Sequence, residues 1–117
     1  MIISRILSIL VAILLLQTLF FKFSAAPESV AIFTKLGVEP WGRILTGVIE
    51  LLISILILIP ATRFWGSAGA AALMVGALLS HYFVLGFAGD NLGLSIMAGF
   101  ILLASIVILF KSKNPLS

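Results

Sequence analysis

The segment Ile44–Ile59, ILTGVIELLISILILI, decides the fold, because it is an apolar run with one charged residue, Glu50, near its middle. Such a run is typical of a membrane-spanning helix. An acid near the centre of a bilayer costs about 2.5–3.5 kcal/mol on insertion scales. It therefore faces the interior of a helix bundle, finds a polar partner, and is by default a functional candidate. The alternative for Glu50 is a structural role, in which a hydrogen-bonded acid only joins two helices.

The composition assigns the whole chain to a membrane. Of its 117 residues, 62% are hydrophobic and 9% are charged, whereas about a quarter of an average soluble domain is charged. Backbone in lipid must satisfy its own hydrogen bonds, and the apolar runs show no strict alternation, so the spans are helices. We predict an all-α fold, a single four-helix transmembrane bundle over residues 1–117 with a short extra helix in the first loop. The four spans are expected at residues 6–23, 41–59, 64–87 and 92–110.

The net charge of +3 does not indicate a nucleic-acid partner, because the basic residues are scattered at span ends and form no stripe. The expected partners are the lipid bilayer and either a partner subunit or a second copy of the chain. The absence of cysteine excludes a catalytic dithiol, a cysteine nucleophile and an iron–sulfur cluster within this chain. One histidine and one intramembrane acid give no metal-binding spacing, so no metal site is predicted.

The distribution of basic residues predicts the orientation. With four spans, both termini lie on one side of the membrane, and that side carries Arg5, Arg63, Lys111 and Lys113. The opposite side carries Lys22, Lys35 and Arg43. Cytoplasmic segments have the excess of Lys and Arg, and the excess here is small. It predicts a multi-pass protein of the inner cell membrane with both termini in the cytoplasm.

The first connection, residues 24–40, is long enough to contain a short helix. Pro27 suits the first helical position, Lys35 the last turn and Gly37 the left-handed cap. A narrow apolar face is made by residues three apart, namely Val30, Phe33 and Leu36. The helix is too short to span, so we expect it to lie on the outer membrane surface or to fold over the mouth of the bundle.

The polar and small residues of the second span follow one helical stripe: Arg43, Thr46, Gly47, Glu50 and Ser54. Glu50 therefore points into the bundle. At about 1.5 Å per residue, Gln17 of the first span lies at a comparable depth, and we expect it to be the partner of Glu50. Lys22, Arg43 and His81 lie nearer the outer surface and are expected to form a basic rim above the acid. The candidate ligand-binding residues are thus Gln17, Lys22, Arg43, Glu50 and His81, and no catalytic residue is identified.

The third span carries small residues four apart, at Ala68, Ala72, Gly76 and Ser80. This spacing lets helix backbones approach closely, so we expect Gly76 to lie at a tight helix–helix contact.

Several segments, in their order and spacing, resemble the DoxX-like family of small four-span membrane proteins. They are FFKF at 20–23, IFTKLGVEP at 32–40, GVIELLISILILIP at 47–60 and TRFWG at 62–66, followed by the small-residue third span that ends in His81. The resemblance extends from the first span to about Gly86. It implies that Glu50 is the shared intramembrane acid, with Lys22 and His81 as the accompanying basic residues. The family name derives from a subunit of a thiosulfate:quinone oxidoreductase complex, which implies an association with membrane redox complexes.

Three functions stay open on this basis. The first is a redox-associated subunit whose polar pocket, in the outer half of the bundle, binds a quinone or a similar amphiphile; a quinone is the one cofactor considered. The second is a non-catalytic accessory or scaffold subunit of a membrane complex. The third is a small proton-coupled exporter, but in the small multidrug resistance family the acid lies in the first helix, which counts against it. Whether the chain is an enzyme is left open, with a subunit of a quinone-linked oxidoreductase as the candidate.

Overall fold

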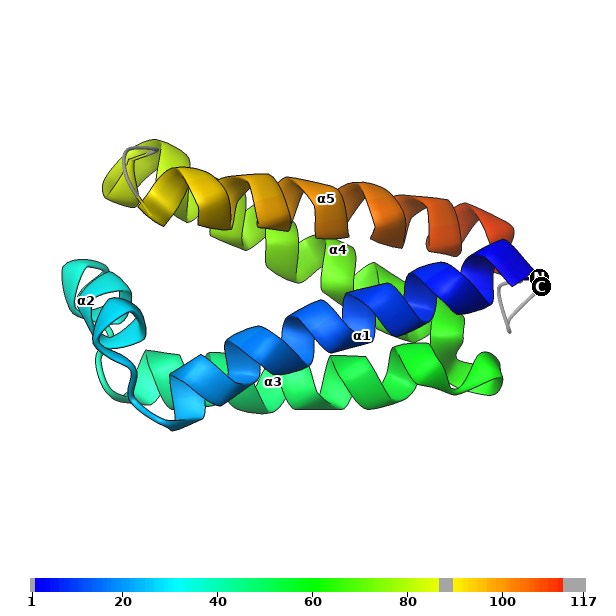
Figure 1. The fold of residues 1–117 in the computed structure, drawn as a ribbon, viewed down its shortest axis with the longest axis horizontal. Helices are drawn as coiled ribbons and strands as arrows, with labels where there is room; N and C mark the ends of the chain where they lie inside the picture. The colour runs from blue at the N-terminus through cyan, green and yellow to red at the C-terminus, as the bar shows by residue number, and fades with distance from the viewer. Residues whose placement is uncertain (1, 87–89, 113–117) are drawn as a thin grey trace.

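The computed structural model describes residues 2–86 and 90–112 and contains no strand within them (Figure 1). Four segments are long and apolar enough to cross a membrane: Ile2–Phe23, Trp41–Leu58, Pro60–Leu85 and Leu92–Lys111. The helices are α1 (Ile2–Phe23), α2 (Pro27–Lys35), α3 (Trp41–Leu58), α4 (Arg63–Ser80) and α5 (Asp90–Lys111), with a 3₁₀ turn η1 (Pro60–Thr62) and a π-helical turn η2 (His81–Leu85). The predicted four-helix transmembrane bundle with one short extra helix is confirmed. The expected end of the third span at Phe87 lies outside the described residues.

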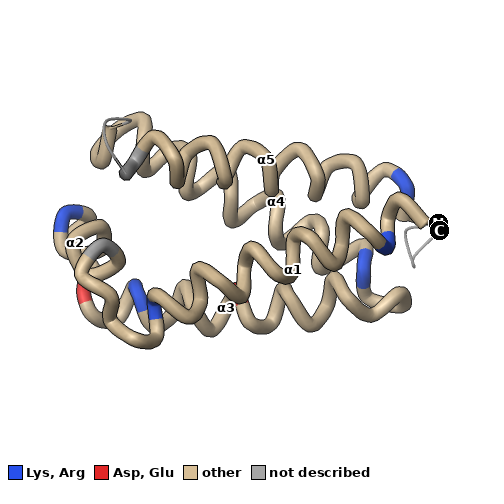
Figure 2. Tube along the Cα trace, viewed as in Figure 1, with Lys and Arg blue, Asp and Glu red and all other residues tan. Residues whose placement is uncertain are grey.

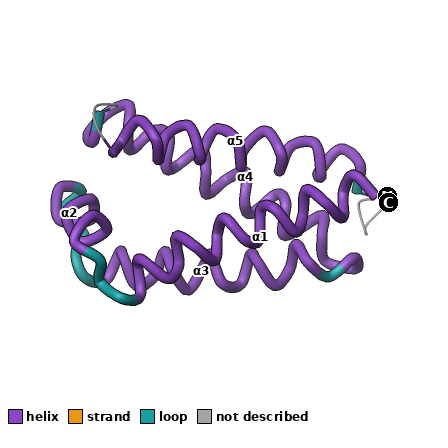
Figure 3. The backbone as a smooth tube through the Cα atoms, in the orientation of Figure 1, coloured by secondary structure: helices purple, strands orange, loops and turns teal. Residues whose placement is uncertain are grey.

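The four long helices form a ring in which each packs on two neighbours, in the order α1, α3, α4, α5. The first residues of α1 and the last residues of α5 lie at one end of the bundle, here called the terminal end, and α2 lies at the other, here called the α2 end (Figure 1). Short loops connect the helices at both ends (Figure 3). The pair α1 and α3 diverges from the pair α4 and α5 toward the α2 end (Figures 1 and 3).

The half of the bundle nearer the terminal end is closely packed. Its core is a cluster of buried aliphatic and small residues: Val11, Ala12, Leu15, Ile53, Ile57, Ala70, Met74, Ala98, Ile101, Ala104 and Ile108. Helices α3 and α4 approach closely at Gly66, where an added Cβ would lie 2.5 Å from the backbone nitrogen of Ile57. Because no real Cβ contact is that short, glycine at position 66 is what lets the two backbones meet.

The prediction that Gly76 lies at a tight contact is wrong. A Cβ built at Gly76 meets nothing within 4 Å, whereas one at Gly66 would overlap the backbone of α3. Helices α3 and α4 leave the turn at η1 in close contact and then diverge, so small residues late in α4 have no neighbouring backbone to approach. These small residues line the cavity described below instead.

The turn between α3 and α4 satisfies the open carbonyl groups at the end of α3. Pro60 has no N–H to donate to them, and the last carbonyls of a helix have no partner within the helix. The Thr62 hydroxyl donates to the carbonyl of Leu56 at 2.7 Å, and the Arg63 guanidinium donates to those of Ile57 and Leu58 at 2.9 and 3.2 Å. Side chains of the turn thus replace the missing backbone donors.

Helix α2 has the bounds that the sequence predicts, from Pro27 to Lys35. Gly37 has φ of +79°, and the amides of Gly37 and Val38 donate to the carbonyls of Thr34 and Phe33, which closes the helix with a Schellman motif. Of the two expected positions for α2, the structure has the helix folded over the mouth of the bundle, because Ser29, Ile32 and Phe33 line the cavity described below.

Charged residues gather at the two ends of the bundle and leave the middle of its length almost free of charge (Figure 2). Arg5 near the start of α1, Arg63 at the start of α4 and Lys111 at the end of α5 belong to the terminal end. This distribution is the one that a multi-pass membrane protein needs, since lipid-facing surfaces between the two interfaces must be apolar.

Candidate functional site

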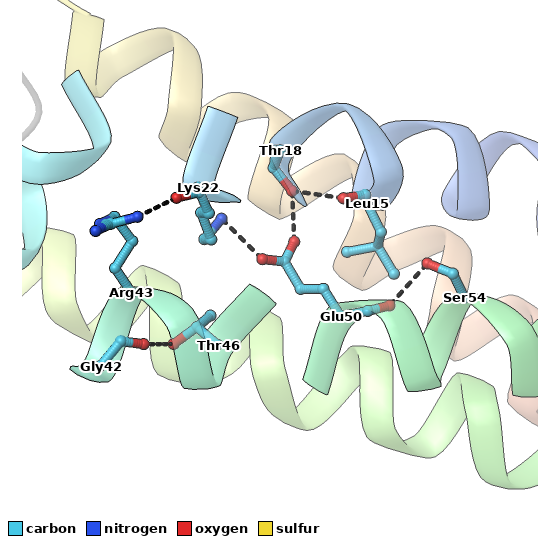
Figure 4. A network of polar contacts seen from close by, with 8 residues as sticks. All are labelled: Leu15, Thr18, Lys22, Gly42, Arg43, Thr46, Glu50 and Ser54. Carbon is cyan, nitrogen blue, oxygen red and sulfur yellow. Dashed lines mark hydrogen bonds and ion pairs between the residues drawn. The ribbon is translucent and has the colours of Figure 1, made fainter. Parts of the chain in front are cut away.

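Glu50 lies in the middle of α3 and is 2% exposed. One turn further along α3, the Ser54 hydroxyl donates back to the backbone carbonyl of Glu50 at 2.8 Å. The residues between them, Leu51 and Leu52, are exposed on the opposite side of the helix. The polar stripe predicted from the sequence is therefore real, and it turns Glu50 toward α1 (Figure 4).

The carboxylate of Glu50 has two partners, both on α1. Its Oε1 lies 2.8 Å from Nζ of Lys22 in an ion pair, and its Oε2 accepts a hydrogen bond from the Thr18 hydroxyl (Figure 4). The same hydroxyl lies 2.9 Å from the backbone carbonyl of Leu15. A threonine hydroxyl has a single hydrogen, so when it donates to Glu50 it cannot also donate fully to Leu15.

Both the backbone and the ammonium group of Lys22 make polar contacts. It belongs to the last turn of α1, and its side chain is 16% exposed. The Arg43 guanidinium donates to the backbone carbonyl of Lys22, and its Nε lies 2.9 and 3.1 Å from the two carboxylate oxygens of Glu39. Arg43 thus fastens the end of α1 to the start of α3 and has its own acidic partner.

Two predictions about the surroundings of Glu50 are wrong. Gln17 is exposed on the outside of α1 and is not the partner of the acid. Lys22 does not sit in a separate basic rim, because it is in direct ion-pair contact with Glu50. The helical period explains both results: Thr18 and Lys22 are four apart and share a face, while Gln17 is turned by about 100° from Thr18. Depth in the membrane alone therefore does not identify the neighbour of Glu50. The four-residue spacing between Thr18 and Lys22 is the sequence signal that could have identified Thr18.

His81 begins the π-helical turn η2 and is buried, with 5% of its surface exposed. Its backbone carbonyl accepts from the Gly86 amide at 2.7 Å, and its ring Nδ1 lies 3.2 Å from the Gly86 carbonyl. Since a carbonyl oxygen can only accept, Nδ1 carries the hydrogen in this contact. Gly86 has φ of +80°, which a residue with a side chain rarely adopts. Turns of the π type are common at functional sites.

A cavity of about 800 Å³ occupies the space between the two diverging helix pairs, beneath α2. Most of its wall is aliphatic or aromatic. The polar residues in the wall are Thr18, Lys22, Ser29, Thr46, Glu50, Ser80 and His81. The cavity thus brings together three of the five candidate residues, Lys22, Glu50 and His81, from three different helical segments. Arg43 and Gln17 are not among the lining residues.

The α4 side of the cavity is lined by small residues, among them Ala72, Gly76 and Ala77. Ala72 and Gly76 are exposed, as are Leu45 and Ile49 of α3, which line the same cavity. The α3 and α4 sides of the cavity therefore include accessible apolar residues.

The polar groups in the cavity wall offer hydrogen bonds and charge. Among the described residues, no group of three or more His, Cys, Asp or Glu could hold a metal ion. The Lys22 ammonium has three hydrogens, so it can donate to a second acceptor while it stays paired with Glu50. An apolar cavity with a few convergent polar groups is the usual form of a small-molecule site, and its volume is within the usual range of roughly 300–1,000 Å³.

Comparison with known families identifies the chain. The model of the DoxX-like family matches residues 6–109, which is nearly the whole sequence. No curated protein and no solved structure gives a match. The match extends over all four spans, including the helix that carries Glu50 and the segment that carries His81, and the protein therefore belongs to the DoxX-like family of membrane proteins.

Proposed function

We propose that this protein binds an amphiphile, a quinone or a molecule of similar shape, in the cavity between its helix pairs, as a subunit associated with a membrane redox complex. The observation that carries the proposal is the Glu50–Lys22 ion pair in the wall of an apolar cavity. Charged groups at that depth are expensive, and they are concentrated where ligands or protons pass.

The form of the cavity supports a ligand that arrives from the bilayer. We place its opening between α3 and α4, because the exposed lining residues there, such as Ile49 and Ala72, are apolar. A ligand with a polar ring and an apolar tail can keep its tail among lipid chains while the ring enters. A ring carbonyl can then accept from the Lys22 ammonium.

We further assign the α2 end to the outer side of the inner cell membrane, with both termini cytoplasmic. The terminal end carries Arg5, Arg63 and Lys111, which supports a cytoplasmic location under the positive-inside rule. The ligand cavity then opens to the outer leaflet.

The proposal is tested by filling the cavity without disturbing the bundle. In the Gly76→Leu variant, the new side chain enters open space, because nothing lies within 4 Å of its Cβ, and it occupies the cavity that Gly76 lines. The matched control is Gly99→Leu, since Gly99 also has nothing within 4 Å but does not line the cavity. Both proteins are reconstituted in lipid nanodiscs and titrated with decylubiquinone.

We expect the wild-type and Gly99→Leu proteins to bind the quinone with similar affinity and the Gly76→Leu protein to bind at least tenfold more weakly. Equal binding by all three proteins, or none by the wild type, would rule out a quinone in this cavity.

A second function, a scaffold subunit, is favoured by one observation: the ion pair joins α1 to α3 and so also has a structural effect. A scaffold would keep its partner complex intact in the Gly76→Leu variant.

A further inference from the structure

Gln17 is a polar side chain on the outer surface of a membrane-spanning helix. It lies six residues before the end of α1 at Phe23, or about 9 Å inside that end. It is exposed, and it has no hydrogen-bond partner among residues 2–86 and 90–112. Its carboxamide has two donor hydrogens and an acceptor oxygen. In hydrocarbon, groups of this kind find partners on neighbouring helices.

The surface around Gln17 has the spacing of a helix–helix interface. Exposed residues recur along α1 at alternating intervals of three and four: Ile3, Ile6, Leu10, Ile13, Gln17 and Phe20. This set is here called the α1 stripe. Its period of 3.5 is the heptad pattern that keeps one face of a helix against another along its whole length. A single polar residue within such a seam fixes the register and the number of helices.

Among the described residues, nothing covers the α1 stripe. The residues of α1 that pack within the bundle lie on other faces, as Val11, Leu15 and Lys22 do. The stripe also avoids every charged residue of the helix, since Arg5 and Lys22 fall outside it. An interface there would leave the cavity and the Glu50 ion pair untouched.

The chemistry of glutamine selects the partner. All copies of the chain insert in one orientation, so two copies meet about a twofold axis along the membrane normal. Each residue of α1 then meets its own counterpart at the same depth. A lysine or a glutamate would repel its counterpart in such a pair, but a carboxamide is self-complementary, because the N–H of one copy can donate to the oxygen of the other.

We propose that the α1 stripe is the interface of a homodimer, in which the carboxamide of Gln17 pairs with that of the second copy. The dimer packs two α1 helices side by side through the heptad residues, with the hydrogen-bonded pair in the half nearer the α2 end. This inference does not depend on what the cavity binds.

Disulfide cross-linking tests the geometry, and the chain has no cysteine of its own to interfere. Ile13→Cys places a thiol on the stripe. Leu52→Cys is the matched control, because Leu52 on α3 is 55% exposed against 56% for Ile13 and lies at a similar depth from the α2 end. In native membranes under mild oxidation, we expect a disulfide-linked dimer from Ile13→Cys and far less from Leu52→Cys. Equal cross-linking at the two positions, or cross-links only to other proteins, would overturn the proposal.

Substitution of Gln17 tests the hydrogen-bonded pair itself. Full-length protein is labelled for energy transfer, and association is measured in vesicles over a range of protein-to-lipid ratios. We expect Gln17→Leu to weaken association about tenfold, as loss of an intramembrane hydrogen bond does, and Gln17→Asn to retain most of it. If Gln17→Leu associates as strongly as the wild type, or if the wild type stays monomeric at every ratio, the proposed interface does not exist.

Discussion

Lys22 and Glu50 form an ion pair across the interface of α1 and α3, with Nζ and Oε1 2.8 Å apart, inside the membrane-spanning part of the bundle. The pair neutralises the one acid that the apolar stretch of α3 contains. Removing either partner leaves a single charge among apolar side chains, which in buried pairs of soluble proteins costs about 3–5 kcal/mol.

The first prediction concerns this coupling. Glu50→Gln and Lys22→Met should each destabilise the bundle by about 3 kcal/mol, because each leaves one charge unpaired. The double variant should be more stable than either single variant, since it removes both charges at once. Unfolding in mixed detergent micelles measures all four proteins. Additive losses in the double variant would show that the two residues are not coupled in the membrane.

The second prediction separates two adjacent residues of α1. Thr18→Val keeps the side-chain shape but removes the hydroxyl that Glu50 Oε2 accepts from, and a buried acceptor left unpaired costs about 1–3 kcal/mol. Thr18→Ser should retain the bond. Gln17→Leu should not lower the stability of the monomer, because Gln17 has no bond within the described chain. The same unfolding experiment at high dilution compares them, and a larger loss for Gln17→Leu than for Thr18→Val would contradict this assignment.

The sequence predicts the fold well because the constraints on it are local. Span length, backbone hydrogen bonding in lipid and the capping residues of α2 each depend on a few neighbouring positions, and Pro27, Lys35 and Gly37 have the positions in the helix that their residue types indicate. The inward direction of Glu50 follows from the helical period of α3 alone, and burial confirms it.

The partners of Glu50 were harder to predict, because they depend on how two helices are rotated against each other. A depth argument gives the level of a residue and not its angle, so it does not separate Gln17 from Thr18, which point in different directions. The role of Gly76 depends on the distance between α4 and α3 at that level. The spacing of small residues in the sequence does not give that distance. Both errors concern relations between helices rather than within one.

The third prediction follows from the two glycines of α4. Gly66→Ala should destabilise the bundle by about 1–3 kcal/mol, because its Cβ would lie 2.5 Å from backbone of α3 that cannot move aside as a side chain can. Gly76→Ala meets no atom and removes a flexible residue from a helix, so it should be neutral or stabilising by up to about 1 kcal/mol. Thermal unfolding in one detergent ranks the stabilities of the two variants. The reverse order would mean that α3 and α4 are in close contact near Gly76 rather than near Gly66.

The last prediction concerns orientation in the cell membrane, for which single cysteines can be introduced into a chain that has none. Thr34 is exposed on α2, and Ala61 is exposed in the turn η1 at the terminal end. If the excess of basic residues at the terminal end holds it in the cytoplasm, a membrane-impermeant maleimide should label Thr34→Cys in intact cells. Ala61→Cys should react only after the membrane is permeabilised. Because the two sites lie at opposite ends of one bundle, labelling of Ala61→Cys alone in intact cells would show the inverted orientation, and the cavity would then open toward the inner leaflet.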